Sequence, residues 1–508
     1  MTEETSLDPS VTEETSLDPA DWQAFRALGH RMVDDMVAFL AQVRQRPVWQ
    51  PVPADVRARF AQPAPMDGQG AEQAYADFLV DVLPYPLGNI HPRFWGWVMG
   101  AGTPLGMLAD LLAAGMNPNV GGRTHVANLV EEQVLAWLKE LLDYPADASG
   151  LLVSGGSMAN LIGLTAARNG RAVVDVRRRG VQATPGPMTL YASVETHSSV
   201  QRAVELLGLG HEALRRVPCR SDFRIDVAAL ERAIAADRAA GCHPFCVVGT
   251  AGTTPTGAID DLGALAEVCA RGGLWFHVDG TFGALAALSP SLRPLLDGMN
   301  RADSLAFDLH KWPGLPYDVG CILVRDAAAH RRAFAMTPDY LARAERGPAA
   351  GEHWFTDYGV ELSRPFRALK VWLSLKAHGA EAFGRIIDQN VAQARDLASL
   401  VAAAPDLELL APVALNVVCF RFVADGLDEA GLNRLNRELL LRLQEGGLAL
   451  PSNATIGGRY GLRVAITNHR SRREDFDLLV REVQRLGRDL AGQGPDGVIA
   501  APRGAESG

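Results

Sequence analysis

Short apolar runs alternate with amphipathic stretches through the middle of the chain, from about residue 151 to residue 324. The runs are hydrophobic at nearly every position, which is typical of strands buried on both faces. The stretches between them, such as 157–168 and 261–270, repeat apolar residues at helical spacing. We therefore predict an α/β fold with a mostly parallel central sheet flanked by helices. The predicted strands are LLVSGG, MTLYASVETH, FCVVGTAGTT, LWFHVD, SLAFDLHK and VGCILV.

The rest of the chain shows other patterns. Residues 21–100 begin with an amphipathic helical pattern that has no core of its own, so we expect a helical segment that packs on another domain or on a partner subunit. We expect a large domain over 101–379 and a smaller α+β domain over 380–490, where NVVCFRF lies between helical stretches. The polar ends, 1–20 and 491–508, are expected to be disordered, and the first contains TEETSLDP twice.

The composition excludes several classes of partner. With 49 basic and 59 acidic residues the net charge is −10, and there is no Lys and Arg cluster, so a nucleic acid is not an expected partner. No apolar run approaches the ~20 residues that cross a bilayer, and the acidic N-terminus does not resemble a signal peptide. Six scattered cysteines favour a reducing cytoplasm. Cys242, His243 and Cys246 lie close together but lack a second ligand pair, so no metal site is expected.

The segment LLVSGGSMANLIGL is typical of a strand, a glycine turn and a helix with Ser157 in its first turn. Free N–H groups and a hydroxyl at a helix N-terminus suit one phosphate group. The segment has neither the dinucleotide fingerprint G-x-G-x-x-G nor the triphosphate loop G-x-x-x-x-G-K-[ST]. Taken alone, it is explained equally well as a tight turn with a capping serine.

Four further residues lie at the ends of other predicted strands, and each also has an ordinary structural explanation. Asp279 ends LWFHVD, where a buried aspartate commonly pairs with the backbone or with an arginine. His197, between a strand and a helix, is explained as a cap, and Thr250 as part of a turn. Lys311 lies between two apolar runs. An unpaired ammonium group there would cost several kcal/mol, so Lys311 is paired, neutral or covalently modified.

Together these residues change the interpretation, because the carboxyl ends of parallel strands meet at one edge of a sheet. A phosphate site, a carboxylate, an imidazole and a lysine are the groups that pyridoxal phosphate (PLP) requires. The combination predicts a PLP enzyme in which Lys311 is tolerated because its nitrogen forms an imine with the cofactor.

The chain resembles the group II PLP-dependent amino-acid decarboxylases, the family of the aromatic-L-amino-acid, histidine and glutamate decarboxylases. The resemblance runs from about residue 21 to residue 490 and implies a fold-type I PLP-dependent transferase fold, with 101–379 as the PLP-binding domain. The matching segments, in the family's order, are HPRFWGW, TPLGMLADLL, SGGSMAN, THSSV, GTAGTTPTGAIDD, HVDGTFGA, DLHKW, TPDYL and RPFRALKVW.

The resemblance assigns roles to the residues already singled out. It implies that Lys311 forms the Schiff base and that Asp279 pairs with the pyridine nitrogen. It further implies that His197 stacks on the ring and donates a proton, and that Gly156 and Ser157 bind the phosphate.

Five more residues receive a role only through the resemblance. Asp308 is implied to help bind the phosphate, although the animal aromatic decarboxylases have asparagine there. Thr250 is implied to lie near the ring oxygen or the lysine, and His310 matches the family's histidine before the lysine. Thr281 replaces the usual alanine and adds a hydroxyl on the cofactor face. Tyr340 matches the family's mobile-loop tyrosine, which protonates the carbon that has lost CO2.

The resemblance implies a homodimeric L-amino-acid decarboxylase that converts an amino acid to an amine and CO2, with an aromatic substrate favoured. Trp97 and Ser363 are expected to line the substrate site, where both differ from the residues usual in aromatic decarboxylases. The alternatives are an aldehyde synthase or an aminotransferase of the same fold, and a relative that binds the cofactor or a partner without catalysis.

Overall fold

The computed structural model describes residues 15–336, 344–351 and 353–492. Most of both expected disordered tails, residues 1–14 and 493–508, therefore lies outside the described residues. The chain divides into two compact units. One contains the residues up to Arg46 together with Pro53–Pro84, and the other contains Pro47–Val52 and the residues from Tyr85 onward.

The first unit is helical, and a helical segment was expected at the start of residues 21–100. Asp21 caps its longest helix by accepting hydrogen bonds from the N–H groups of Gln23 and Ala24. The Tyr75 hydroxyl donates to Asp35 Oδ2 at 2.7 Å and so ties two of the helices together. The helices are α1 (Trp22–Ala41), α2 (Ala54–Arg59) and α3 (Ala71–Asp77).

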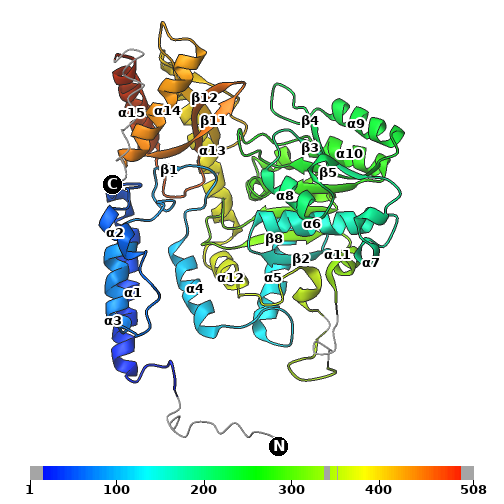
Figure 1. Cartoon of the computed structure of the whole chain (residues 1–508), viewed down its shortest axis with the longest axis horizontal. Helices are drawn as coiled ribbons and strands as arrows, with labels where there is room; N and C mark the ends of the chain where they lie inside the picture. Colours follow the sequence, from blue (N-terminus) through cyan, green and yellow to red (C-terminus); the bar gives the residue numbers. More distant parts are fainter. Residues whose placement is uncertain (1–14, 337–343, 352, 493–508) are drawn as a thin grey trace, which may run out of the picture. The chain divides into compact units, whose positions relative to one another are not determined.

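The second unit is built on a seven-stranded sheet with the order β2-β8-β7-β6-β5-β3-β4 (Figure 1). β8 runs antiparallel to both neighbours, and the remaining pairs are parallel. The strands are β2 (Ser149–Val153), β3 (Met188–Ser193), β4 (Leu214–Val217), β5 (His243–Thr250), β6 (Trp275–Asp279), β7 (Ser304–Asp308) and β8 (Gly320–Val324). All six predicted strands are present, and the α/β prediction is confirmed. The edge strand β4 was not predicted, because its sequence LRRV carries two arginines.

Helices cover both faces of this sheet, and the alternation of residues along β6 shows which helix covers which face. On one face α6 (Gly156–Arg171) runs across β5, β6, β7 and β8. A Cβ atom on Gly163 of α6 would lie 2.7 Å from His277 Cε1, so His277 faces α6. A Cβ atom on Gly249 would lie 3.1 Å from Phe276 and also close to leucines of α10 (Leu262–Gly272), so Phe276 faces α10. Asp279, two residues after His277, therefore points to the α6 side.

The helices of this region are α4 (Pro104–Met116), α5 (Val126–Leu141), α6 (Gly156–Arg171), α7 (Val176–Arg179), α8 (Ser198–Leu206), α9 (Val227–Ala239), α10 (Leu262–Gly272), α11 (Ala327–Phe334) and α12 (Ala368–His378). Those from α6 to α10 lie between strands of the sheet in the sequence, as the α/β pattern predicts. The helices α4 and α5 precede β2, and α11 and α12 follow β8.

The C-terminal part forms a second sheet with the order β1-β11-β12-β10-β9. The edge strand β1 comes from the N-terminal side of the large sheet and pairs parallel to β11. Trp95 of β1 stacks on Phe476 with ring centroids 4.9 Å apart. The elements are β1 (Phe94–Trp95), α13 (Ala380–Ala403), β9 (Leu407–Leu409), β10 (Val417–Phe422), α14 (Glu429–Glu445), β11 (Leu450–Ile456), β12 (Arg459–Ala465) and α15 (Arg473–Gly492).

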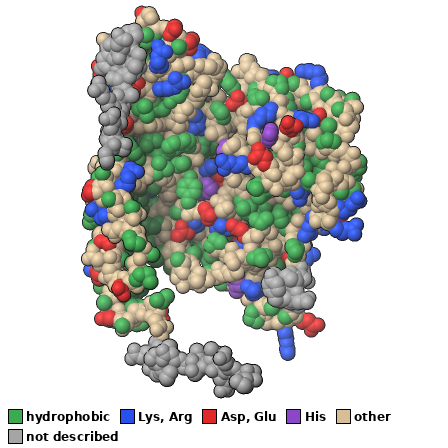
Figure 2. All heavy atoms as spheres, viewed as in Figure 1, with side chains coloured by type: hydrophobic (Ala, Val, Ile, Leu, Met, Phe, Trp, Pro, Cys, Tyr) green, Lys and Arg blue, Asp and Glu red, His purple; other side chains and the backbone are tan. Residues whose placement is uncertain are grey.

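The described helices include none with the length and apolar character needed to cross a membrane. Basic and acidic side chains are interspersed over most of the face shown in Figure 2. This distribution agrees with the mixed charge of the sequence.

A histidine of α11, outside the predicted site, is fully buried against β2. The Nδ1 atom of His330 lies 2.9 Å from Ser149 Oγ, and burial lowers the pKa of His330 to about 3. An exposed histidine in an unfolded chain titrates near pH 6.5, so the unfolded chain binds more protons below that pH. The contribution of His330 to stability is therefore complete above about pH 6.5 and is lost as the pH falls towards 3.

We predict that His330→Gln reduces the acid sensitivity of folding. Between pH 7 and pH 5 the wild-type free energy of unfolding should fall by about 2 kcal/mol more than that of the variant. Urea unfolding at the two pH values measures the difference. His211→Gln, at an exposed position, is the control and should behave as wild type. Equal losses in wild type and His330→Gln would contradict the prediction.

Candidate active site

The predicted site residues gather where the parallel strands of the large sheet end. Thr250, Asp279 and Asp308 are the last residues of β5, β6 and β7. Thr250 is the register partner of Asp279, so the two side chains leave the same face of the sheet. Ala306 of β7 is opposite Asp279 on its other side. The sheet topology therefore brings together residues from three separate segments at its carboxyl edge.

Lys311 is paired with a buried carboxylate. Its Nζ atom lies 3.0 Å from Asp308 Oδ2, and the side chains are 22% and 1% exposed respectively. His310 Nε2 lies 3.6 Å from the same carboxylate oxygen. Burial lowers the pKa of His310, although the negative charge of Asp308 opposes this shift. In this state Asp308 supplies the countercharge that a lysine between two buried strands requires.

The N-terminus of α6 meets these residues at very close range. A Cβ atom on Gly156 would lie 2.1 Å from Thr281 Cγ2 and 3.1 Å from Asp308 Oδ2. A Cβ atom on Gly155 would lie 3.1 Å from His310 Cε1. Glycine is required at Gly156 because no side chain fits there. The backbone at the start of α6 is consequently held beside Asp308 and Thr281. The next residue of the helix, Ser157, is exposed.

Both carboxylate oxygens of Asp279 are held by donors. Oδ1 accepts hydrogen bonds from the Thr281 hydroxyl at 2.8 Å and from the Thr281 N–H at 3.2 Å. Oδ2 accepts a hydrogen bond from Asn160 Nδ2 at 3.0 Å. The sequence suggested the backbone or an arginine as the partner of Asp279. Among the described residues a backbone partner is present, the N–H of Thr281, and the other partners are the Thr281 hydroxyl and the amide side chain of Asn160 rather than an arginine.

His197 is oriented by the start of α8. Its Nδ1 atom accepts a hydrogen bond from the Ser199 N–H at 3.2 Å and lies 2.9 Å from Ser199 Oγ. Because Nδ1 accepts, the neutral imidazole carries its proton on Nε2. Burial lowers the pKa of His197, while the charge of Asp279 opposes the shift and that of Lys311 adds to it. His197 thus combines the cap that the sequence allowed with a place near Asp279 and Lys311.

The remaining predicted residues are Trp97, Ser363 and Tyr340. Trp97 belongs to a segment that packs on the lysine loop, since a Cβ atom on Gly100 would lie 1.7 Å from the His310 carbonyl oxygen. Arg463 Nη1 donates to the Trp97 carbonyl at 2.8 Å and fixes this segment to β12. Ser363 is exposed, and no hydrogen bond within the described ranges links it to the other predicted residues. Tyr340 lies outside the described residues.

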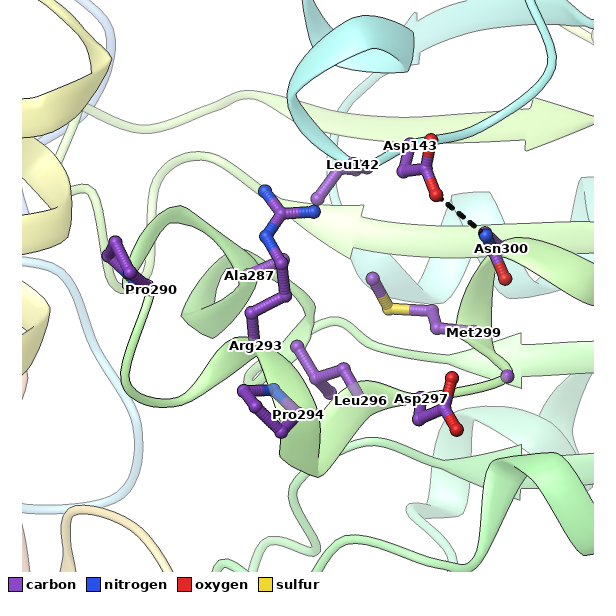
Figure 3. Close-up of a pocket in the computed structure, with 11 residues that line it drawn as sticks. Leu142, Asp143, Ala287, Pro290, Arg293, Pro294, Leu296, Asp297, Met299 and Asn300 are labelled. Atoms are coloured by element: carbon purple, nitrogen blue, oxygen red, sulfur yellow. Dashed lines mark hydrogen bonds between the residues drawn. The ribbon is translucent and has the colours of Figure 1, made fainter.

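A cavity of about 450 Å³ elsewhere in the large unit contains none of the predicted residues. It lies between the end of α5 and the segment 290–300, which precedes β7, and so is near the amino ends of the strands (Figure 3). Asn300 Nδ2 donates to Asp143 Oδ2 at 2.8 Å beside it. The geometry of the carboxyl edge, rather than this cavity, therefore identifies the candidate site.

Comparison with known proteins decides the family. The family described as pyridoxal-dependent decarboxylase conserved domain matches residues 53–423. The chain belongs to this family. This confirms the expected decarboxylase family and its cofactor, PLP, and establishes the chain as a PLP-dependent decarboxylase-family enzyme.

Individual relatives agree with this assignment over nearly the whole chain. An aromatic-L-amino-acid decarboxylase of Bacillus atrophaeus is 34% identical over 92% of this chain and 96% of its own length. A phenylacetaldehyde synthase of Petunia hybrida is 29% identical over 88% of this chain and 90% of its own length. The crystal structure of Oryza sativa TDC with PLP and tryptamine matches with a TM-score of 0.85 and 27% identity. It covers 94% of this chain and 100% of that one.

The side chains at the carboxyl edge fit this cofactor. Within the part of the chain that the structure describes, Thr250 Oγ1 and Asp308 Oδ1 are buried without a hydrogen-bond partner. Buried polar atoms are rarely left unpaired, so each of these atoms suits a polar ligand. Gly155 and Gly156 add a backbone approach that is free of side chains. An aldehyde with a phosphate and a ring nitrogen uses a lysine, a helix N-terminus and a carboxylate, all of which are present.

Sequence reasoning missed four residues that surround the predicted ones. The structure adds Asn160, Ser199, His277 and Ser304, which are all buried. The alternation in WFHVD places His277 on the same face as Asp279, and Asn160 lies one helical turn after Gly156. These spacings were the available signal, although they identify neighbours along one element and do not show contacts between α6 and β6.

We predict that Gly156→Ala lowers stability through a clash with Thr281. The free energy of unfolding should fall by about 1–3 kcal/mol, as in other overpacked interiors. In a Thr281→Ser background, which removes Cγ2 and keeps the hydroxyl, part of this loss should be recovered. Thermal unfolding of the four proteins in this double-mutant cycle measures the coupling.

Gly115→Ala in α4 is the matched control for this cycle. Nothing lies within 4 Å of the Cβ position there, so this change should be neutral or stabilise by up to about 1 kcal/mol. Additive effects of Gly156→Ala and Thr281→Ser would contradict the predicted contact.

Proposed function

We propose that this chain is an L-amino-acid decarboxylase that converts an aromatic amino acid to its amine and CO2. The observation that carries the proposal is the meeting of Lys311, Asp279 and His197 at the carboxyl edge of one sheet. Its similarity to an aromatic-L-amino-acid decarboxylase over nearly the full length supports both the reaction and the substrate class.

In this proposal the protein divides the work among the residues of the site. Lys311 is the point of attachment of the cofactor, and Asp279 pairs with the ring nitrogen. When bound, PLP supplies an electron sink for the electron pair left by departing CO2. His197 stacks on the ring and offers its Nε2–H, since Nδ1 is occupied by Ser199.

The phosphate is assigned to the start of α6. A helix N-terminus offers free N–H groups to an anion, and the backbone at Gly156 lies close to Asp308, which is ion-paired to Lys311. We propose that Asp308 exchanges this ion pair for other donors when the lysine nitrogen is attached to the cofactor. Thr250 Oγ1 and Asp308 Oδ1, both buried without a partner in the described part of the chain, take up polar contacts in the same step.

The aromatic substrate is assigned to the segment that begins with Trp97. This side chain is 47% exposed, and the segment packs on the His310–Lys311 backbone. An exposed indole close to the reacting lysine offers a flat apolar surface to an aromatic ring. We assign Ser363 to the same substrate site on the strength of the resemblance.

We further propose a homodimer. Apolar side chains that a monomer leaves in water are concentrated on α4 and α5, where Leu111 is 58% and Leu129 is 62% exposed. Several large apolar side chains left exposed on two helices are typical of a subunit interface. Leu112, Met116 and Val126 are exposed on the same two helices.

The proposed reaction predicts CO2 release that depends on Lys311. Purified protein loaded with PLP should release CO2 and the matching amine from at least one of tryptophan, tyrosine, phenylalanine and dihydroxyphenylalanine. Lys311→Ala should lower this rate by roughly 10²–10⁴-fold, because the group that acts on cofactor and substrate is lost. Lys376→Ala, an exposed lysine of α12, is the matched control and should retain the rate. A full amino-acid panel that yields no CO2 would refute the proposal.

A second candidate reaction is aldehyde formation, which the similarity to a phenylacetaldehyde synthase favours. We expect Tyr340 to decide between the two, as the proton donor to the carbon that has lost CO2. Tyr340→Phe should move the product from amine towards aldehyde with ammonia and hydrogen peroxide. Mass spectrometry of the products under air measures the ratio. A wild-type enzyme that gives mainly aldehyde would establish the second reaction instead.

A further inference from the structure

A line of buried hydrogen bonds leads from the start of β6 to the carboxylate at its end. Trp275 Nε1 donates to Ser304 Oγ at 2.8 Å, and Ser304 Oγ lies 2.8 Å from His277 Nδ1. His277 Nε2 lies 3.0 Å from Asn160 Oδ1, and Asn160 Nδ2 donates to Asp279 Oδ2 at 3.0 Å. All five side chains are buried, and those of Asn160 and His277 are 0% exposed.

The chemistry of the two ends fixes the direction of every hydrogen bond in this line. An indole N–H only donates, so the Ser304 oxygen accepts from Trp275 and its own hydrogen is free for His277 Nδ1. Burial lowers the pKa of His277 to about 4, so the imidazole is neutral at pH 7. With Nδ1 accepting, the proton of His277 is on Nε2 and is donated to Asn160 Oδ1.

The amide of Asn160 then has only one consistent orientation. Its oxygen faces the N–H of His277, and its nitrogen faces the carboxylate of Asp279. The reversed amide would place two oxygens against each other at Asp279 and two N–H groups against each other at His277. Donors therefore run in a single sense from Trp275 to an ionised carboxylate, where consecutive hydrogen bonds strengthen one another.

Asn160 also reaches the histidine of the site. Its second N–H donates to Ser199 Oγ at 3.0 Å, so the Ser199 hydroxyl donates in turn to His197 Nδ1 at 2.9 Å. One amide side chain therefore holds Asp279 directly and His197 through a single hydroxyl. These are the two residues assigned to the ring of the cofactor.

The packing of α6 on β6 is built around this line. Gly163 lies over His277, where a Cβ atom would be 2.7 Å from Cε1, and Gly170 lies over Trp275, where it would be 3.2 Å from Cζ3. Together with Gly156 and Asn160, these glycines follow a spacing of four, three and seven residues, which is one face of a helix. A helix with larger residues at these positions could not bring Asn160 within hydrogen-bonding distance of β6.

We propose that Asn160 and His277 are positioning residues that hold Asp279 ionised and aligned for a ring nitrogen and hold His197 with its proton on Nε2. The proposal rests on the assignment of Asp279 and His197 to the PLP ring under Proposed function. It predicts that interrupting the line weakens cofactor binding although neither residue is among those assigned to the cofactor.

The test compares Asn160→Leu with Asn436→Leu. Asn436 is also fully buried and hydrogen-bonded, to the backbone of Phe422 and Leu432, but it lies in the C-terminal sheet region. Absorbance titration gives the dissociation constant for PLP. Asn160→Leu should raise it about tenfold or more, since a hydrogen bond to a charged acceptor is lost. Asn436→Leu should lower the thermal midpoint yet stay within about twofold of wild type for PLP.

Two further measurements separate positioning from a general loss of structure. In the PLP-free wild-type chain labelled with ¹⁵N-histidine, the signal that disappears in His277→Gln should belong to an imidazole with its proton on Nε2. His277→Gln keeps an N–H donor and an acceptor, so its dissociation constant for PLP should stay within about threefold of wild type. His277→Phe has neither group, and its dissociation constant should rise by more than this. With substrate, Asn160→Leu should lower kcat more than it changes KM.

The outcomes are distinguishable. Equal PLP dissociation constants for Asn160→Leu and Asn436→Leu would overturn the inference, as would a His277 proton on Nδ1. Failure of the wild-type chain to bind PLP would instead refute the proposed function and the inference with it. Tight binding by wild type with no CO2 from any amino acid would leave the positioning role intact and refute only the decarboxylase assignment.

Discussion

An ionised carboxylate in the interior of a protein is stable only if hydrogen-bond donors replace the water that it has lost. Asp279 at the end of β6 is in this situation, and much of the surrounding structure supplies such donors. Thr281 occupies one carboxylate oxygen with two donors, and Asn160 occupies the other with one. In the proposed function, the ring nitrogen of the cofactor is the remaining partner of this carboxylate. Because these donors already orient the carboxylate of Asp279, it needs no rearrangement when the cofactor binds.

The need for these donors constrains how α6 packs on β6. The helix must lie close enough to β6 for Asn160 to touch Asp279, and glycines at 156 and 163 permit that approach. The side chain of Thr281 fills the space over Gly156, where a Cβ atom would otherwise lie. The start of the same helix lies beside Asp308, which is paired with Lys311. The packing of one helix on one strand therefore positions both the side chains around Asp279 and those around Asp308.

The sequence predicted the architecture better than it predicted the contacts. Near-continuous hydrophobicity revealed six strands of the large sheet, and strand ends led to His197, Asp279 and Lys311 as one group, whereas Asp308 was found only through the family resemblance. The partner of Asp279 was not predictable in this way, because Asn160 lies 119 residues earlier on another element. His277 was hidden because a histidine inside an apolar strand resembles any satisfied core residue. The edge strand β4 and the two-residue strand β1 lack a hydrophobic pattern long enough to be recognised, and both depend on tertiary pairing.

The place of β1 has a consequence for how the protein is made. Arg93 Nε donates to the carbonyl of Leu448, 355 residues further along, and the strand that follows Arg93 pairs with β11. At about 5–20 residues per second, a ribosome needs roughly 20–70 s to synthesise the chain between these partners. All seven strands of the large sheet emerge during that interval, while Phe94 and Trp95 have no edge to join. Phe94 and Trp95 can therefore reach their places in the second sheet only after β11 (Leu450–Ile456) has been translated.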